Sequence, residues 1–581
     1  MPLKSSGNRR LWPFPFGSWR VADSQEAPLA SELPAARLVL RSRRKPLGNA
    51  NNSIRGGLSM SDSDAAMTGA EALVSTLADH GVTACFANPG TSEMHLVTAL
   101  DREPRIRSVL CLFEGVATGA ADGYARVTGR PAMTLLHLGA GFMNGGANIH
   151  NAKRAWTPMI NVIGDHSVPH LRYDAPLTSN IMGLAGPNSV WIKSANHVSV
   201  TGDLAAEAWA ASFGPVPGPV SLILPADSAW TEGATPGKTR AQPFLRAPDT
   251  ALVEAAAKAV KSAKKPMILI SGTALTGPGL GHAARLKAAG IRVLTDTFFP
   301  RQVRGAGIFA PERMQYFAEG AMADLEGTDL MLVAGTQVPV AFFAYPGKPS
   351  LLVPEGCTPM VLGGPESDSA AILEALADTM GLTEAAPAPT LEIPDAPTGA
   401  LNAATIGASI ARHMPEGTFV SDDGVSNGLP SFMMTGRARP HDWMMLTGGA
   451  IGQGMPLALG AAIGAKGRKV LCLTGDGAGM YTNQALWSMA REKADVINIV
   501  FVNHSYRILN IELARTGAGN PGRVAADLLG LGRPEIDWVK LSEAQGVPAV
   551  NATTAEEFDA ALARAFSEPG PHLIAAHVPA R

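Results

Sequence analysis

The sequence predicts a large α/β protein built on parallel β-sheets. Apolar runs of strand length alternate with amphipathic helical segments, and several of these runs end in glycine turns. Strands of parallel sheets are buried on both faces, so they are expected as continuous apolar runs rather than alternating ones. At 581 residues, with 46% apolar and only 17% charged residues, the chain should form several domains rather than one core.

Three domains are predicted, at residues 63–235, 250–382 and 400–580. The segments between them are rich in Pro, Gly and Ala, which is typical of linkers. Helices are expected at 70–81, 114–129 and 145–156, in alternation with the strands of the first domain. The expected strands are 83–90, 131–141, 158–166 and 220–225 in the first domain, 291–299 and 329–335 in the second, and 418–423, 469–475, 496–502 and 572–578 in the third.

Residues 1–62 differ in composition from the rest and are predicted to be a disordered leader. Residues 1–60 contain ten Lys or Arg and three Asp or Glu, in a chain whose net charge is −2. The segment lacks helical or strand periodicity and has no apolar stretch long enough for a secretion signal. It fits either an organelle-targeting peptide or translated sequence upstream of a start at Met60, and the second interpretation is favoured.

Composition also bears on partners and compartment. The apolar runs fall well short of the roughly 18 residues of a spanning helix, so no membrane association is expected. The acidic balance after residue 60 offers no basic face for nucleic acid. The four cysteines show no C-x-x-C pairing and resemble small core residues of a reducing compartment, so a cytoplasmic protein is predicted.

The stretch KVLCLTGDG, followed by QALWSMAREK and VINIVFVN, predicts a strand–helix–strand unit with neighbouring parallel strands. Asp476 and Asn503, 27 positions apart, would then lie together at the carboxyl ends of the two strands. The glycine turn opens a helix whose free N–H groups favour a phosphate. A carboxylate, an amide oxygen and a helix start together indicate a magnesium–diphosphate site, although a Gly-Asp-Gly turn alone is also a common strand end.

With TGGAIGQGMPLALG and CLFEGVATGAADGYARVTG, this stretch resembles the thiamine-diphosphate-dependent enzymes of the acetolactate synthase, benzoylformate decarboxylase and pyruvate decarboxylase group. The resemblance covers about residues 63–578 and implies pyrimidine-binding, central and diphosphate-binding domains in that order. It implies that Mg²⁺ is held by Asp476, Asn503 and the backbone carbonyl of Ser505, with His504 at a variable position between them. Val502 stands where the family often has a further Asn.

The resemblance further implies a set of residues around thiamine diphosphate. Ile451 would wedge the bent cofactor, with the Gly449 carbonyl facing its amino group, and Ser426 would contact the diphosphate. The other implied cofactor-binding residues are Glu114, Gly475, Asp476, Gly477, Ala478, Asn503, Ser505 and Tyr506. The central domain lacks the flavin-binding stretches of a full acetolactate synthase, so the sequence does not support a prediction of bound FAD.

Three residues are implied to be catalytic. Glu114 would reach N1′ of the cofactor's aminopyrimidine, although a Glu at a helix start is ordinarily a solvated acid. Thr91 and His137 match the hydroxyl residue and the histidine of benzoylformate-type decarboxylases, although a histidine at a strand end is often structural. The second histidine of those decarboxylases is missing, because AFFAYPGKP offers Phe342 and Phe343 in its place.

The implied function is a Mg²⁺- and thiamine-diphosphate-dependent carboligase or decarboxylase of a 2-oxo acid, acetolactate synthase-like in overall type. The first alternative is a benzoylformate decarboxylase-like enzyme for a bulky or aromatic 2-oxo acid. The second is a non-catalytic cofactor-binding relic, and a third is a nucleotide-binding protein, for which no G-x-x-x-x-G-K-[ST] motif occurs. The family also implies a homodimer or homotetramer whose active sites are shared between chains.

Overall fold

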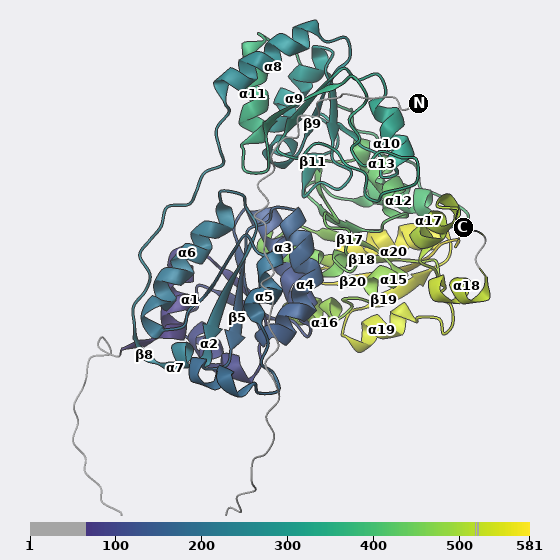
Figure 1. Ribbon diagram of the computed structural model, residues 1–581. Helices are drawn as coiled ribbons and strands as arrows, with labels where there is room; N and C mark the ends of the chain where they lie inside the picture. The colour runs from purple at the N-terminus through teal and green to yellow at the C-terminus, as the bar shows by residue number, and fades with distance from the viewer. Residues whose placement is uncertain (1–65, 518, 520–521, 581) are drawn as a thin grey trace, which may run out of the picture. The chain divides into compact units, whose positions relative to one another are not determined.

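A computed structural model describes residues 66–517, 519 and 522–580 (Figure 1). The leader predicted at residues 1–62 lies outside the described residues. The described part of the chain contains three large β-sheets, each with helices packed on it, and the mixed α/β class with parallel sheets is confirmed. None of the helices in this part is long and apolar enough to cross a membrane.

The first sheet has six strands in the order β3-β2-β4-β5-β7-β6, and all its neighbouring pairs are parallel. Its strands are β2 (Ala84–Asn88), β3 (Arg107–Leu110), β4 (Ala132–Leu136), β5 (Met159–Asp165), β6 (Trp191–Ser194) and β7 (Pro219–Pro225). The helices of this region are α1 (Gly69–Asp79), α2 (Met94–Asp101), α3 (Glu114–Thr128), α4 (Leu138–Arg154), α5 (Ile181–Ala185), α6 (Thr201–Phe213) and α7 (Ala226–Trp230). A small antiparallel pair, β1 (Met67–Thr68) and β8 (Glu232–Ala234), joins the two ends of the region.

The second sheet has five parallel strands in the order β12-β10-β9-β13-β14. These are β9 (Pro266–Ile270), β10 (Arg292–Thr295), β12 (Glu312–Arg313), β13 (Leu330–Ala334) and β14 (Thr358–Gly363). Its helices are α8 (Thr250–Ser262), α9 (Gly279–Ala288), α10 (Ala318–Leu325) and α11 (Ser369–Thr379).

The third sheet has seven strands in the order β11-β16-β15-β17-β18-β20-β19, and only β11 runs antiparallel to its neighbour. The strands are β11 (Gln302–Arg304), β15 (Phe419–Asp423), β16 (His441–Met445), β17 (Val470–Gly475), β18 (Val496–Val502), β19 (Ala549–Ala552) and β20 (His572–His577). The helices are α12 (Ala403–His413), α13 (Gly428–Met434), α14 (Gly454–Gly464), α15 (Asp476–Gly479), α16 (Ala485–Glu492), α17 (Arg507–Arg515), α18 (Arg523–Leu529), α19 (Trp538–Ala544) and α20 (Ala555–Ser567). Strand β11, at the edge of this sheet, comes from the chain segment between β10 and β12, which are strands of the second sheet.

The structure differs from the sequence prediction mainly at element ends. The run 131–141 is a strand only to Leu136, because His137 is the N-terminal cap of α4, which starts seven residues before the predicted helix at 145. The strand expected at 291–299 stops at Thr295. Several strands are not predicted, among them β3, β11, β12 and β14. Strands β6 and β19 are also missed, because each is four residues long and only partly buried and so lacks a long apolar run.

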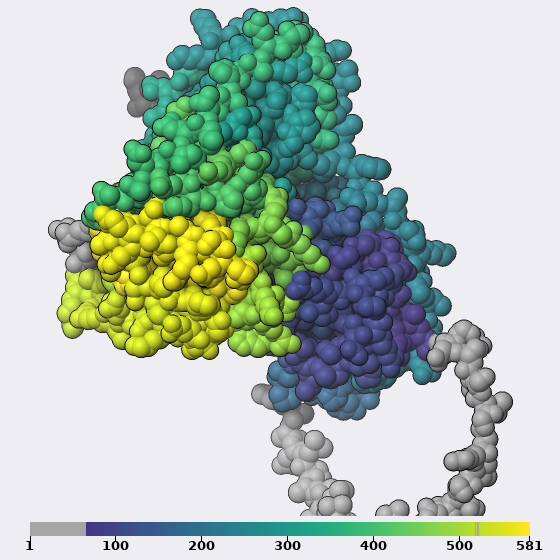
Figure 2. All heavy atoms as spheres, turned by 180° about the vertical axis from the view of Figure 1, so that it is seen from behind, coloured from purple at the N-terminus to yellow at the C-terminus, as the bar shows by residue number. Residues whose placement is uncertain are grey.

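Helices α3 and α14 pack the first region against the third within one chain. Figure 2 shows blue and yellow-green parts of these two regions side by side on one face of the molecule. Glycines make this close approach possible. A Cβ at Gly460 of α14 would lie 1.8 Å from the Ala120 carbonyl oxygen, and one at Gly123 of α3 would lie 2.0 Å from the Leu457 carbonyl oxygen. Because no side chain fits at these two positions, the helices touch through their backbones.

Candidate active site

Asp476 and Asn503 follow neighbouring strands of the third sheet. Strands β17 and β18 are parallel, with Gly475 opposite Phe501, so both residues lie at the same sheet edge, as predicted. The Asp476 carboxylate accepts the backbone N–H of Gly477 at 2.9 Å and that of His504 at 2.7 Å. The second of these bonds ties the turn after β17 directly to the turn after β18.

The oxygens at this edge fit a hard cation. Burial raises the pKa of Asp476, and the backbone N–H groups that donate to its carboxylate partly offset this rise. A cation beside the carboxylate would favour the charged form. Asn503 is buried, and its Oδ1 accepts the Ser505 N–H at 3.0 Å. Carboxylate and amide oxygens are the ligands that Mg²⁺ prefers. A Cβ at Gly475 would meet open space, so the turn also leaves room beside these oxygens.

The turn at Gly477 is covered by Tyr506. A Cβ at Gly477 would lie 2.5 Å from the Tyr506 ring, so glycine is needed for the ring to close over the turn. Ala478 is buried in the same short helix, α15. The predicted residues at 475–478 and 503–506 therefore form one compact cluster.

The loop that contains Gly449 and Ile451 is held from two regions. Asp423, at the end of β15, accepts the N–H groups of Gly452 at 2.8 Å and Gly454 at 3.1 Å. Asn151 of α4 donates to the Ala450 carbonyl at 2.8 Å and accepts the Ala450 N–H at 3.2 Å. The Asn151 side chain of α4 thus holds this loop of the third region, which belongs to the same chain.

A cavity of about 1180 Å³ opens beside this loop. Ser426, Gly449, Ile451 and Tyr506 line it, so four of the predicted cofactor-binding residues face one space. Six aromatic side chains of the second region also line it and form an aromatic wall: Phe298, Tyr316, Phe317, Phe342, Phe343 and Tyr345.

The aromatic wall is a packed unit. The ring of Phe342 lies 5.4 Å from that of Phe298 and 4.8 Å from that of Tyr316, between centroids. Two guanidinium groups, of Arg313 and Arg507, and two carboxyl groups, of Asp422 and Glu512, also line the cavity. Burial lowers the pKa of Arg313 to about 10, and the Nη1 of Arg507 donates to Asn427 at 3.2 Å. The cavity therefore offers apolar rings and guanidinium groups together.

Glu114 is the first residue of α3 in the first region and is only 5% exposed. Its Oε2 accepts the side-chain amide of Asn144 at 3.0 Å. A Cβ at Gly141 would lie 2.9 Å from its Oε1 and 3.4 Å from the Cβ of His137, so these two predicted residues are neighbours. Glu114 is not the solvated first-turn acid that its position in the sequence would ordinarily suggest.

His137 and Thr91 lie at the ends of the adjacent strands β4 and β2. The His137 Nδ1 lies 2.8 Å from Oε2 of Glu93, whose side chain is fully buried. A Cβ at Gly90 would lie 2.0 Å from this nitrogen, so the ring packs on the Gly90 backbone. Burial raises the pKa of Glu93, partly offset by His137, and Thr91 is exposed beside the pair.

Backbone strain gathers around the predicted residues. Non-glycine residues with φ near +50° include Leu138, Val425 and His504, which adjoin His137, Ser426 and Asn503. Such φ values are costly for branched side chains and concentrate at functional sites. The strain is present in both the first and the third regions.

The predicted residues form two clusters rather than one. In the described part of the chain, no hydrogen bond joins Thr91, Glu114 or His137 to the cluster around Asp476, and none of these three lines the cavity. Sequence reasoning missed four supporting residues: Glu93, Asn144, Asn151 and Asp423. Of these, only Glu93 could have been found from the sequence, because a Glu three positions after Gly90 is typical of a helix cap. In the structure it accepts the Gly90 N–H at 2.8 Å.

Comparison with known proteins agrees with this arrangement. The family model "Thiamine pyrophosphate enzyme, N-terminal TPP binding domain" matches residues 67–183, and the corresponding C-terminal TPP binding domain matches residues 429–576. These matches contain the Glu114 and Asp476 clusters respectively.

Similar proteins extend over most of the chain. A Mycobacterium tuberculosis protein named "Putative acetolactate synthase large subunit IlvX" is 49% identical over 522 residues, which cover 88% of this chain and 99% of that protein. Benzoylformate decarboxylase of Pseudomonas aeruginosa is 26% identical over 525 residues, covering 85% and 96%. The crystal structure of benzoylformate decarboxylase from Polynucleobacter necessarius has a TM-score of 0.77 at 23% identity, covering 88% and 99%, and so shares the fold. The chain belongs to the family of thiamine pyrophosphate-dependent enzymes.

Proposed function

We propose that the protein is a Mg²⁺- and thiamine-diphosphate-dependent decarboxylase of 2-oxo acids that carry a bulky or aromatic group. The observation that supports this most is the aromatic-walled cavity beside Ile451 and Tyr506. Apolar rings with a few placed polar groups are the usual lining of a small-molecule site.

The third region would hold the cofactor. Asp476, Asn503 and the Ser505 carbonyl would bind Mg²⁺, while the N–H groups of residues 475–478 and Ser426 would contact the diphosphate. Gly449 and Ile451 would face the rings. When bound, thiamine diphosphate supplies a carbon nucleophile that adds to the 2-oxo group and accepts the electrons released as CO₂ leaves.

Glu114 would hold a proton at N1′ of the aminopyrimidine. The Asn144 amide occupies Oε2, so Oε1 is the oxygen that remains for this contact. A buried carboxyl group suits proton sharing, because burial keeps water from competing for the contact. This role depends on the carboxyl group and not on the shape of the side chain.

Two chains would complete each site, with Glu114 from one copy and Asp476 from another. Large apolar side chains are exposed beside both clusters: Leu112 at 47% and Met143 at 56% near Glu114, and Met480 at 40% and Tyr481 at 53% near Asp476. Exposed apolar patches of this kind mark interfaces. We therefore propose a homodimer or a homotetramer built from such dimers.

The substrate would be oriented by charge and by apolar contact. Arg313 and Arg507 line the cavity and are suited to a carboxylate, while Phe342 and Phe343 provide an apolar wall. His137 would deliver the proton that replaces CO₂, and Glu93 would position its ring. An imidazole suits this task because it can both accept and donate a proton.

Carboligation of a second carbonyl compound is the other candidate. The name of the 49%-identical relative favours it, since that name refers to acetolactate synthase. The two reactions share every step up to loss of CO₂ and differ in whether a proton or a second carbonyl carbon is then added.

Product analysis in the presence of thiamine diphosphate and Mg²⁺ distinguishes decarboxylation from carboligation. We expect benzoylformate to give an aldehyde, and His137→Ala to reduce turnover by roughly 10²–10⁴-fold, the range for a positioned acid or base. His95→Ala, at an exposed histidine of α2, is the matched control and should retain activity. Acetolactate formed from pyruvate at a rate that His137→Ala leaves unchanged would instead establish the carboligase.

A further inference from the structure

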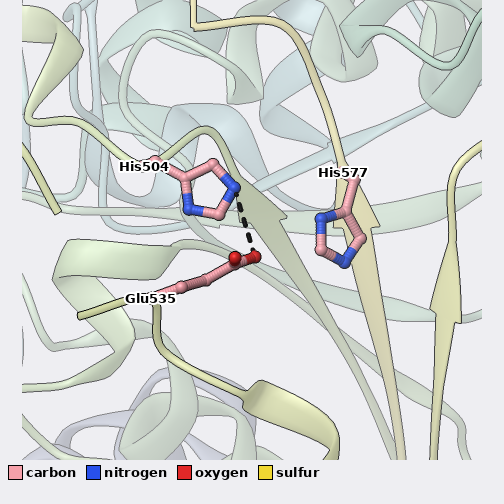
Figure 3. A group of neighbouring side chains, drawn as sticks. All are labelled: His504, Glu535 and His577. Carbon is pink, nitrogen blue, oxygen red and sulfur yellow. Dashed lines mark ion pairs between the residues drawn. The ribbon is translucent and has the colours of Figure 1, made fainter. Parts of the chain in front are cut away.

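We infer that His504, Glu535 and His577 form a second metal site, which binds a late first-row divalent cation such as Zn²⁺ (Figure 3). None of these three side chains has a role in the proposed catalytic function. The site lies next to the Mg²⁺ ligands in sequence but uses different donor atoms.

The three donor atoms already converge. One ligand atom from each residue lies within 4.8 Å of the other two, and the His504 Nε2 lies 3.5 Å from Oε1 of Glu535. Ligands bound to tetrahedral Zn²⁺ at 2.0–2.1 Å are about 3.3 Å apart. The Glu535 side chain is 59% exposed, so it can rotate by the small amount needed to close the site.

His577 is prepared to act as a ligand. Its Nε2 lies 2.9 Å from Oδ1 of Asn551, an acceptor, so Nε2 carries the proton and donates it. The other nitrogen, Nδ1, then has a free lone pair, and Figure 3 shows this edge of the ring turned toward His504 and Glu535. A metal-binding histidine is commonly fixed in this way by a partner on its second nitrogen.

The backbone holds the two histidines in place independently of a metal. Val502 of β18 lies opposite His577 of β20 in the parallel sheet, so the two rings project from adjacent strand ends. His504 has a φ of 54°, its N–H donates to Asp476 at 2.7 Å and its carbonyl accepts the Leu531 N–H at 2.7 Å. The backbones that carry the two histidines are therefore held in place, and the exposed Glu535 side chain is free to adjust.

Donor chemistry keeps this site distinct from the Mg²⁺ site. Two imidazoles and one carboxylate favour Zn²⁺, Ni²⁺ or Cu²⁺, whereas the oxygens of Asp476 and Asn503 favour Mg²⁺. A cation bound by Glu535 and His504 would also fasten the chain before α19 to the turn that carries Asn503.

Co²⁺ provides a direct test, because four-coordinate Co²⁺ with imidazole ligands absorbs visible light much more strongly than six-coordinate Co²⁺ in an oxygen site. Holoenzyme saturated with Mg²⁺ and thiamine diphosphate is titrated with Co²⁺, and then with Zn²⁺ as a competitor. We expect one strongly absorbing Co²⁺ per chain, which Zn²⁺ displaces. Thermal melts check that each variant is folded.

Glu535→Gln and His577→Ala should each abolish the strong absorption, and Asn551→Ala should weaken Zn²⁺ affinity by about 10–100-fold, as loss of such a partner does. Glu543→Gln, at an exposed glutamate of α19, and His197→Ala, at an exposed histidine, are the controls and should behave as the native chain does. Absorption that persists in folded Glu535→Gln and His577→Ala would overturn the site, as would its absence from the native holoenzyme.

Discussion

The carboxylates of Asp476 and Glu114 are both buried at strand–helix junctions, yet they are held in different ways. Both oxygens of Asp476 accept backbone N–H groups, which cannot rotate away. Glu114 is held through one oxygen by the Asn144 side chain, and its Oε1 has no hydrogen-bond partner in the described part of the chain. A carboxylate fixed by the backbone suits a cation ligand, whereas one with an unused oxygen suits proton sharing with a bound group.

The sharpest test of this difference removes the fixed carboxylate. Asp476→Ala should abolish measurable Mg²⁺-dependent binding of thiamine diphosphate. Mg²⁺ would lose its carboxylate ligand, and the negative charge of the diphosphate would then be uncompensated. Isothermal titration with the cofactor measures this. Asp378→Ala, at an exposed aspartate that pairs with Arg285, should bind as the native chain does. Unchanged cofactor affinity in Asp476→Ala would refute the assignment.

Glu114→Gln should leave the cofactor bound but slow exchange of its C2 proton by roughly 10²–10⁴-fold, since an amide cannot share the N1′ proton. NMR of the bound cofactor in D₂O measures the exchange rate. Near-native exchange would remove Glu114 from the mechanism.

The same two variants test whether two chains share a site. If they do, co-expressed Glu114→Gln and Asp476→Ala chains should form mixed dimers in which one site has both native residues. Because one of its two sites is native, a mixed dimer should have about half of the activity of a native dimer. A fully active monomer in sedimentation would contradict shared sites.

A smaller effect is expected at the aromatic wall. Phe342→Ala removes a ring packed on Phe298 and Tyr316, so kcat/KM for benzoylformate should fall by about 10-fold, in keeping with the ~0.5–1.5 kcal/mol of one aromatic pair plus lost contact area. The rate on pyruvate, which carries a methyl group in place of the ring, should change less. Equal losses on both substrates would mean that Phe342 supports the fold rather than selectivity.

The smallest effect concerns stability. Burial raises the pKa of Asp423 to about 7, so the folded chain retains a proton there that an unfolded aspartate loses near pH 4. The folded state binds more protons between these values, and the free energy of unfolding therefore decreases as pH rises from about 4 to 7. Asp423→Asn should flatten this part of the dependence in thermal melts of the cofactor-free protein. An unchanged slope would show that Asp423 does not titrate in this range.

The sequence by itself determined the α/β class and the pairing of Asp476 with Asn503. Both follow from local patterns. Buried parallel strands appear in the sequence as continuous apolar runs, and a strand–helix–strand unit places its two strand ends together. The motif at Glu114 likewise indicated a functional carboxylate, but its burial could not be read from a helix-start position. Only the folded chain shows the Asn144 contact.

The tertiary structure alone decided the features that join distant segments. Glu93 reaches His137 across 44 positions, Asn151 reaches Ala450 across 299, and the cavity combines rings of the second region with a loop of the third. The cluster of His504, Glu535 and His577 likewise brings together three separate segments of the chain. No local periodicity encodes such contacts, because they depend on which sheet edges and helix ends meet after packing, and that is set by the sum of many buried contacts.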